Sequence, residues 1–221
     1  MQFPYSFIAI EGNIGAGKTT FCRLMEERMG SHTILEAFDD NPFLPYFYED
    51  PERHAFSVEL FFMTERHKQL QNELAQRNLF QSLTVSDYIF TKTLLFARNN
   101  LNREEYRLFQ RLFAILKTSF PPPELIVYFH RPVNELLENI KQRGRSYEQD
   151  ISAEYLSSIE RAYFDYFRSL SGTPVLILDV AGLRFWEDDA GFTALADLLT
   201  QTYAPGLHYL RPAEATVPKA G

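Results

Sequence analysis

A glycine-rich segment close to the N-terminus places the strongest constraint on the fold of this chain. It follows the apolar residues 7–10 and reads Gly12-Asn13-Ile14-Gly15-Ala16-Gly17-Lys18-Thr19-Thr20. The segment matches the pattern G-x-x-x-x-G-K-[ST], in which a loop between a buried strand and a helix cradles phosphates. The backbone N–H groups of such a loop form an anion-binding nest, and the following helix adds the positive end of its dipole. We therefore expect residues 12–20 to bind a nucleoside triphosphate.

Two side chains of this segment have specific expected roles. Lys18 would reach the β- and γ-phosphates, and the hydroxyl of Thr19 would help to hold Mg²⁺. The alternative is a glycine-rich turn that matches the pattern by chance. The apolar run before the segment and the helical pattern after it supply the context in which the pattern is meaningful, so we favour the phosphate loop.

Short β-rich runs alternate with longer amphipathic runs along the chain. The strand candidates lie at residues 7–11, 33–36, 83–87, 125–130 and 175–179. The helix candidates lie at residues 18–29, 52–77, 88–98, 103–118, 132–143, 152–170 and 189–202. This alternation predicts a three-layer α/β fold, in which a short parallel sheet of about five strands carries helices on both faces. Residues 1–202 would form one domain, and residues 203–221, which lack periodicity, would form a loose C-terminal tail.

Composition excludes several classes of protein. The formal net charge of −7 argues against a general nucleic-acid-binding surface. Apolar runs fall short of the roughly 20 residues that span a bilayer, and the N-terminus lacks a signal-peptide pattern. The single cysteine, Cys22, allows no intrachain disulfide. We therefore expect a cytoplasmic protein without nucleic-acid or membrane partners.

The second and third strand candidates each end in a carboxylate. Ligands of open α/β sheets bind outside the carboxyl ends of the strands, where the first strand also delivers the glycine-rich segment. Glu36 and Asp87 would therefore converge near the γ-phosphate. A carboxylate at this position is suited to act as a general base or to orient Mg²⁺ and its waters.

Several segments together resemble the deoxyribonucleoside kinases, and in particular their bacterial deoxyadenosine/deoxyguanosine kinase branch. They are residues 12–20, Leu35-Glu36-Ala37-Phe38-Asp39-Asp40-Asn41-Pro42-Phe43, Val85-Ser86-Asp87-Tyr88-Ile89-Phe90, Thr93-Leu94-Leu95-Phe96-Ala97 and Arg143-Gly144-Arg145-Ser146-Tyr147-Glu148-Gln149. The resemblance covers about residues 6–180. It implies a P-loop kinase fold, ATP and Mg²⁺ as cofactors, a small-molecule deoxynucleoside as acceptor, and a homodimer.

The resemblance also implies roles for residues around the acceptor. Glu36 would accept the proton of the nucleoside 5′-hydroxyl, because an alcohol is a weak nucleophile at neutral pH. Tyr48 would reach the 3′-hydroxyl of the deoxyribose and share it with Glu148. The alternatives are a helix-capping or solvated Glu36, and a Tyr48 that only packs against Phe47.

Glu59 and Arg66 fall on one face of the predicted helix 52–77. Relatives often carry glutamine at the position of Glu59, where it reads an edge of the base, and Arg66 matches a pocket arginine. An ionised carboxylate only accepts hydrogen bonds, and guanine offers two adjacent N–H donors. The substitution therefore favours deoxyguanosine, unless Glu59 and Arg66 form only a surface ion pair.

The segment after the third strand departs from better-known relatives, which have Glu/Asp-Arg-Ser there. The sequence Ser86-Asp87-Tyr88 contains no arginine. Asp87 would take the acidic role of the motif, either holding Mg²⁺ and its waters or orienting the attacking hydroxyl, and the arginine would be replaced from elsewhere or not needed. Lys92 lies where relatives often place an acidic residue of the base pocket. It would pair with Glu59 or contact a guanine oxygen, or it would simply be solvated.

Arg143 and Arg145 flank a glycine at the end of the predicted helix 132–143. Two guanidinium groups on such a turn suit a lid that closes over the transferring phosphoryl group. The alternative is a pair of arginines that caps the C-terminus of the helix.

Together these residues predict the ATP-dependent 5′-phosphorylation of a purine deoxyribonucleoside, with deoxyguanosine favoured and deoxyadenosine next. The nearest rival is a nucleoside monophosphate kinase of the thymidylate kinase type, whose acceptor phosphate Glu36 and Glu59 would repel. A P-loop nucleotide-binding protein without metabolic chemistry is the second rival.

Overall fold

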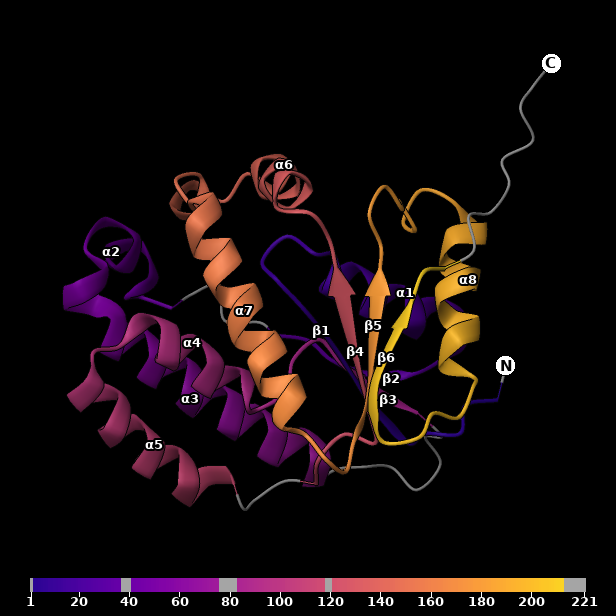
Figure 1. Ribbon diagram of the computed structural model, residues 1–221, viewed down its shortest axis with the longest axis horizontal. Helices are drawn as coiled ribbons and strands as arrows, with labels where there is room; N and C mark the ends of the chain where they lie inside the picture. The colour runs from indigo at the N-terminus through magenta and orange to yellow at the C-terminus, as the bar shows by residue number, and fades with distance from the viewer. Residues whose placement is uncertain (1, 37–40, 76–82, 118–120, 213–221) are drawn as a thin grey trace.

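The computed structural model describes residues 2–36, 41–75, 83–117 and 121–212. Its centre is a parallel sheet in the strand order β2-β3-β1-β4-β5-β6 (Figure 1). The strands are β1 (Phe7–Gly12), β2 (His32–Ile34), β3 (Thr84–Ser86), β4 (Leu125–His130), β5 (Pro174–Asp179) and β6 (Gly206–Leu210). The α/β class with helices around a parallel sheet is as predicted.

Helices follow most of the strands. They are α1 (Lys18–Met29), α2 (Leu44–Glu49), α3 (Pro51–Ala75), α4 (Lys92–Asn100), α5 (Arg103–Lys117), α6 (Val133–Arg143), α7 (Ala153–Ser169) and α8 (Asp189–Leu199), with a 3₁₀ turn at Ser146–Glu148. Most predicted helices match within a few residues. The short α2 lacks a clear periodic pattern and was not predicted, and the predicted helix 88–98 begins only at Lys92.

The central strands β1, β4 and β5 are mainly apolar because both faces of the sheet are buried, and their few polar residues lie toward the carboxyl ends. Alternate residues of β1 point to opposite faces. Ile8 and Ile10 pack with residues of α1, α6 and α8, whereas Ala9 packs with residues of α4 and α7. This two-sided core fixes the three-layer arrangement.

A further group of helices lies outside α4. Helices α2, α3 and α5 form a second apolar cluster with α4, around Phe47, Val58, Met63 and Phe109. The cleft between this cluster and the carboxyl ends of the strands receives the loop after β1, the segments after β2 and β3, and the turn after α6. The fold therefore brings the predicted site residues to one edge of the sheet.

The predicted loose tail is wrong for residues 206–210, which form β6. This strand pairs in parallel with β5, with Pro174 opposite Gly206 and Leu178 opposite Leu210, so the sheet has a sixth strand beyond the five predicted. Residues 37–40, 76–77 and 118, which belong to predicted segments, lie outside the described residues, as do residues 213–221. Within the described chain, every helix is too short or too polar to cross a membrane.

Candidate active site

The loop between β1 and α1 depends on glycine at two positions. Gly15 and Gly17 have φ values of 82° and 93°, in the region that side chains disfavour. A Cβ atom on Gly15 would lie 2.7 Å from the carbonyl oxygen of Leu136, and one on Gly17 would lie 3.0 Å from Cζ of Phe185. The loop is therefore confined between α6 and the segment after β5.

Lys18 folds back over this loop. Its Nζ donates to the carbonyl oxygens of Gly12 and Asn13, each at 2.9 Å. Burial, with the nearby charge of Lys92, lowers the pKa of Lys18 to about 8. Because a phosphate would restore the charged form of Lys18, the loop is electrostatically suited to an anion.

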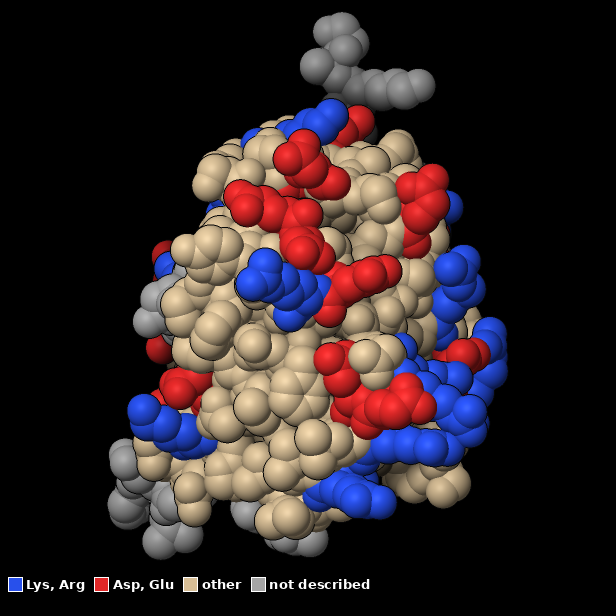
Figure 2. Space-filling view, turned by 90° about the vertical axis from the view of Figure 1, so that its left-hand side faces the viewer, with Lys and Arg blue, Asp and Glu red and all other residues tan. Residues whose placement is uncertain are grey.

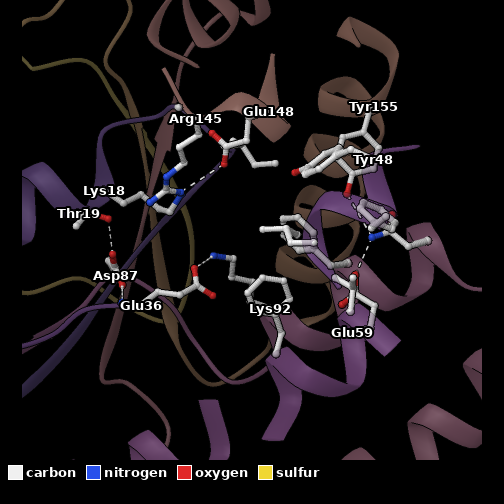
Figure 3. Close-up of a pocket in the computed structure, with 18 of the residues that line it drawn as sticks. Lys18, Thr19, Glu36, Tyr48, Glu59, Asp87, Lys92, Arg145, Glu148 and Tyr155 are labelled. Carbon is white, nitrogen blue, oxygen red and sulfur yellow. Dashed lines mark hydrogen bonds and ion pairs between the residues drawn. The ribbon is translucent and has the colours of Figure 1, made fainter. Parts of the chain in front are cut away.

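Thr19 and Asp87 meet at the first turn of α1 (Figure 3). Thr19 Oγ1 donates to Asp87 Oδ2 at 2.5 Å, and the backbone N–H of Glu36 donates to Asp87 Oδ1 at 2.7 Å. Burial and the negative charge of Glu36 raise the pKa of Asp87. Hydroxyl and carboxylate oxygens beside a phosphate loop are the donors that Mg²⁺ accepts from proteins, so these two residues fit that ion.

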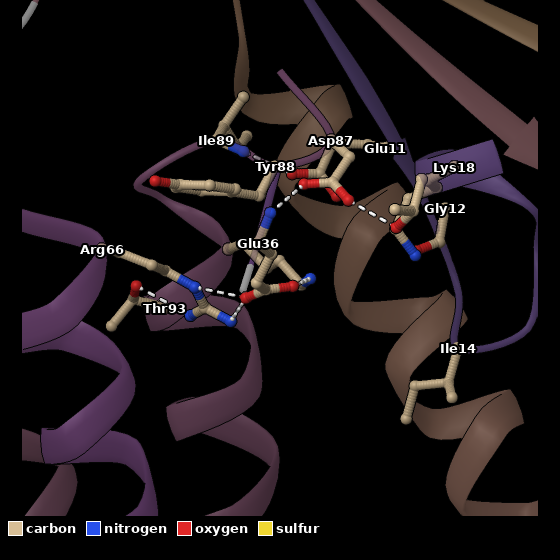
Figure 4. A network of polar contacts seen from close by, with 12 residues as sticks. Glu11, Gly12, Ile14, Lys18, Glu36, Arg66, Asp87, Tyr88, Ile89 and Thr93 are labelled. Carbon is tan, nitrogen blue, oxygen red and sulfur yellow. Dashed lines mark hydrogen bonds and ion pairs between the residues drawn. The ribbon is translucent and has the colours of Figure 1, made fainter. Parts of the chain in front are cut away.

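Glu36 lies two residues beyond β2 and is held by two cations, Lys92 (Figure 3) and Arg66 (Figure 4). Arg66 donates to Oε1 through Nε at 2.8 Å and Nη2 at 2.5 Å, and Nζ of Lys92 donates to Oε2 at 2.5 Å. Burial alone would raise the pKa of Glu36, but the charges of Arg66 and Lys92 outweigh it and hold the pKa well below its usual range. Glu36 is therefore ionised at neutral pH.

These contacts correct two sequence-based expectations. Lys92 is buried rather than solvated and pairs with Glu36 rather than with Glu59. Arg66 is 3% exposed and also pairs with Glu36, while its Nη1 donates to Thr93 Oγ1 at 3.0 Å. The alternative expectation that Glu59 and Arg66 form only a surface ion pair is therefore wrong. The reason is that Glu36 enters the cleft from β2, where a carboxylate attracts both cations.

The turn after α6 carries the predicted lid residues. Arg143 is the last residue of α6 and Gly144 ends the helix in a left-handed conformation. Arg143 donates to Glu148 Oε2, and Nη1 of Arg145 lies 3.4 Å from Glu148 Oε1. Both guanidinium groups thus converge on the carboxylate of Glu148, which is 5% exposed.

The far end of the cleft is built by α2, α3, α4 and α7. Glu59 of α3 is 1% exposed, and its Oε1 accepts from Nδ2 of Asn100 at 2.7 Å. Burial raises the pKa of Glu59 to about 7, although Arg66 and Asn100 oppose the shift. Tyr48 stacks on Tyr147, with ring centroids 6.1 Å apart, and also contacts Phe47.

The residues of the phosphate loop, of the segments around Glu36 and of the far end line one cleft, which contains about 910 Å³ of space that is partly open to solvent. Figure 3 shows Lys18, Thr19 and Asp87 at one end and Tyr48, Glu59 and Tyr155 at the other. Glu36 and Lys92 lie between the two ends, and Arg145 and Glu148 lie above them. The arrangement places a phosphate loop and an enclosed, partly aromatic pocket on opposite sides of one carboxylate.

Sequence reasoning missed three residues of this region. Glu11 is completely buried, and its carboxylate accepts from the N–H of Ile89 at 2.7 Å and from the hydroxyl of Tyr163 at 2.6 Å. A charged residue at the end of an apolar strand was a signal that could have revealed it. Asn100 and Tyr155 carry no such signal, because they reach the cleft only through the packing of α4 against α7.

A phosphate loop and an acceptor pocket on a parallel sheet of this topology define a P-loop kinase, an enzyme that transfers phosphoryl groups. The chain belongs to the deoxynucleoside kinase family, whose family model matches residues 8–202. The family resemblance seen in the sequence is thereby confirmed.

The chain is similar to deoxyguanosine and deoxyadenosine kinases of other organisms. The chain is 33% identical over 157 residues to a deoxyguanosine kinase of Bacillus subtilis (strain 168), which covers 71% of this chain and 76% of that protein. It is 33% identical over 199 residues to a deoxyadenosine kinase of Dictyostelium discoideum, and this match covers 89% of this chain and 78% of that protein. A deoxyadenosine kinase from M. mycoides, solved with bound dATP, has the same fold, with a TM-score of 0.73 at 21% identity over 88% of this chain and 100% of that one.

Proposed function

We propose that the enzyme transfers the γ-phosphoryl group of ATP to the 5′-hydroxyl of a purine deoxyribonucleoside, with deoxyguanosine preferred over deoxyadenosine. The observation that carries this proposal is the position of Glu36 between the phosphate loop and the pocket that contains Glu59. A carboxylate there suits an alcohol as acceptor, because it takes up the proton that the hydroxyl loses.

The residues divide the reaction between them. Residues 12–20 hold the triphosphate, with Lys18 on the β- and γ-phosphates. Glu36 accepts the 5′-hydroxyl proton as the oxygen bonds to the γ-phosphorus, while the bond from that phosphorus to the β-phosphate oxygen breaks and ADP leaves. Arg143 and Arg145 would turn from Glu148 onto the equatorial oxygens of the transferring group.

Thr19 and Asp87 would hold Mg²⁺. When bound, the ion neutralises the charge that develops on the β- and γ-phosphate oxygens. The proposal places Asp87 here because its carboxylate already contacts Thr19 and the backbone N–H of Glu36. The carboxylate thus links the donor side of the cleft to the general base.

The acceptor would be held at both of its ends. Tyr48 and Glu148 line the cleft together and would share the 3′-hydroxyl of the sugar. At the other end, Glu59 would accept from the N1–H edge of guanine when it is ionised. Arg66 would contribute through Glu36, whose carboxylate it holds through two nitrogens.

Lys92 supplies the cation that the Glu/Asp-Arg-Ser motif of other relatives would supply as arginine. Its ammonium contacts the same carboxylate that activates the acceptor, and it faces the donor end of the cleft. Replacement of Lys92 by Met should lower kcat by at least about a hundredfold, the usual cost of losing one preorganised charge contact at a reacting centre.

The measurement is steady-state ADP release, with thermal unfolding recorded in parallel. Lys92→Arg should recover part of the activity because it keeps the charge, whereas Arg98→Met on the exposed part of the same helix serves as the control. A normal kcat in Lys92→Met would contradict this role.

We further propose a cytoplasmic homodimer that binds neither nucleic acid nor membrane. Figure 2 shows uncharged residues over the left and lower parts of one face, with acidic groups running from its top into its middle and basic groups gathered at its right. Such a face supports self-association better than binding to a polyanion. Light scattering of the purified protein tests the dimer.

The decisive test of the activity is a panel of acceptors. ADP release is measured with ATP and Mg²⁺ against deoxyguanosine, deoxyadenosine, deoxycytidine, thymidine and thymidine monophosphate. We expect turnover on the two purine nucleosides, highest with deoxyguanosine. Turnover on the monophosphate alone would establish the monophosphate kinase, and slow hydrolysis without any acceptor dependence would establish the non-metabolic alternative.

A further inference from the structure

The carboxyl group of Glu59 uses its two oxygens differently. Oε1 accepts from Nδ2 of Asn100 at 2.7 Å, whereas Oε2 is buried and has no hydrogen-bond partner among the described residues. A buried polar atom without a partner costs about 1–3 kcal/mol, so such atoms are normally completed by water or by a ligand. Because the cleft lined by Glu59 is the acceptor pocket, the partner of Oε2 would be the base.

Asn100 is oriented by its own contacts. Its Nδ2 also donates to the hydroxyl of Tyr155 at 3.3 Å, and its Oδ1 accepts from Nδ2 of Asn99 at 3.0 Å. The amide therefore turns its donor end toward Glu59. An oxygen that already accepts an N–H bond is the poorer place for a proton, so a proton on this carboxyl group belongs on Oε2.

We propose that Asn100 is a positioning residue of base recognition, which holds one oxygen of Glu59 so that the other presents either an acceptor or a donor to the base, according to whether it carries a proton. This inference rests on the proposed acceptor pocket. It replaces the fixed acceptor assumed from the sequence with a pocket that has two states.

The two purines require opposite states. Guanine carries a hydrogen on N1 and donates it, whereas adenine has a lone pair on N1 and accepts. Ionised Glu59 would accept from guanine and oppose the lone pair of adenine. Protonated Glu59 would donate to adenine and face the N1–H of guanine with a second donor. Protonation of Glu59 would thus switch the preferred base from guanine to adenine.

The surroundings of Glu59 place this change near neutral pH. Burial raises its pKa to about 7. The ionisable groups that face it are Arg66 on α3, Lys92 on α4, Glu36 after β2, Tyr48 on α2, Tyr155 on α7, and Glu148 with Arg143 and Arg145 in the lid. Glu36 stays ionised because its pKa is held low, and burial raises the pKa values of Tyr48 and Tyr155, which therefore stay neutral.

The sign of the pH dependence follows directly. Below pH 7 Glu59 is mostly protonated and deoxyadenosine is favoured, and above pH 7 it is mostly ionised and deoxyguanosine is favoured. The ratio of kcat/KM for deoxyguanosine to that for deoxyadenosine should therefore rise with pH, by up to about tenfold per pH unit between pH 6 and 8. Titration of Lys18 at the donor site affects both nucleosides alike and cancels in this ratio.

Three variants test the inference by the same pH series. Glu59→Gln has no ionisable carboxyl group, so its ratio should be constant with pH. Asn100→Leu removes the hydrogen bond that stabilises the ionised carboxylate, so the pH at which the ratio changes should move upward. Glu52→Gln, an exposed substitution on the same helix, should behave as the unaltered enzyme.

The outcomes are distinguishable. A ratio that does not change with pH in the unaltered enzyme would overturn the inference while leaving the kinase activity in place. An unshifted profile in Asn100→Leu would remove Asn100 from base recognition, and if that variant does not fold, Asn100→Ser is measured instead. Absence of turnover on any deoxynucleoside would overturn the proposed function itself.

Discussion

Replacement of Glu36 by Gln is expected to lower kcat by about a hundredfold to ten-thousandfold, the range that general-base catalysis contributes. Gln is nearly isosteric, but its amide does not take up the proton of the 5′-hydroxyl. The hydrogen bonds from Arg66 and Lys92 to Glu36 would persist only in part, because an amide offers one acceptor oxygen instead of two. The measurement is the rate of ADP release at saturating ATP and nucleoside.

A loss of stability has to be separated from this loss of chemistry. Removing the anion from two buried cations costs about 3–5 kcal/mol when nothing replaces it, so the melting temperature should also fall. Equilibrium binding of the nucleoside to the folded variant separates the two effects, and Glu138→Gln on the exposed side of α6 is the matched control. If the folded variant binds nucleoside and keeps near-normal turnover, another group is the base.

Replacement of Arg143 by Gln is expected to lower kcat by about a thousandfold or more, the usual contribution of an arginine that stabilises the transferring phosphoryl group. Arg143→Lys should recover little, because an ammonium does not reproduce the paired donors of a guanidinium group. The measurement is kcat and the KM of the nucleoside, determined separately.

The values of kcat and KM must be determined separately because Arg143 also contacts Glu148, which would bind the sugar. If Arg143 only positions Glu148, its loss should raise the KM of the nucleoside and leave kcat near normal, which is the result that contradicts the lid role. Arg184→Gln, an exposed arginine that pairs with Glu187, controls for the change in surface charge.

The parts of the site that sequence predicted well are those fixed by local chain geometry. The glycines at positions 15 and 17 indicate a phosphate loop. Their φ values are positive, and a Cβ atom at either position would lie too close to neighbouring atoms. Glu36 and Asp87 follow from the rule that ligands gather at the carboxyl ends of parallel strands. In each of these cases the pattern within a few residues carries the physical constraint.

The parts that sequence missed depend on contacts between distant elements. Lys92 reaches the carboxylate of Glu36, 56 residues earlier in the chain, only because α4 packs beside α3. The pKa of Glu59 depends on burial by several helices, which no local pattern reveals. Strand β6 is five residues long and follows Pro205, so it becomes recognisable only when β5 offers an edge for pairing.

Glu11 joins three distant segments of the chain beneath the cleft. Its carboxylate binds β1 to Ile89, 78 residues later, and to Tyr163 of α7, 152 residues later. These two hydrogen bonds hold together the start of the phosphate loop, the segment that carries Asp87, and one wall of the proposed acceptor pocket. In the proposed mechanism, the turn that bears Arg143 and Arg145 would move to admit and enclose the substrates, while the segments joined by Glu11 would keep their places.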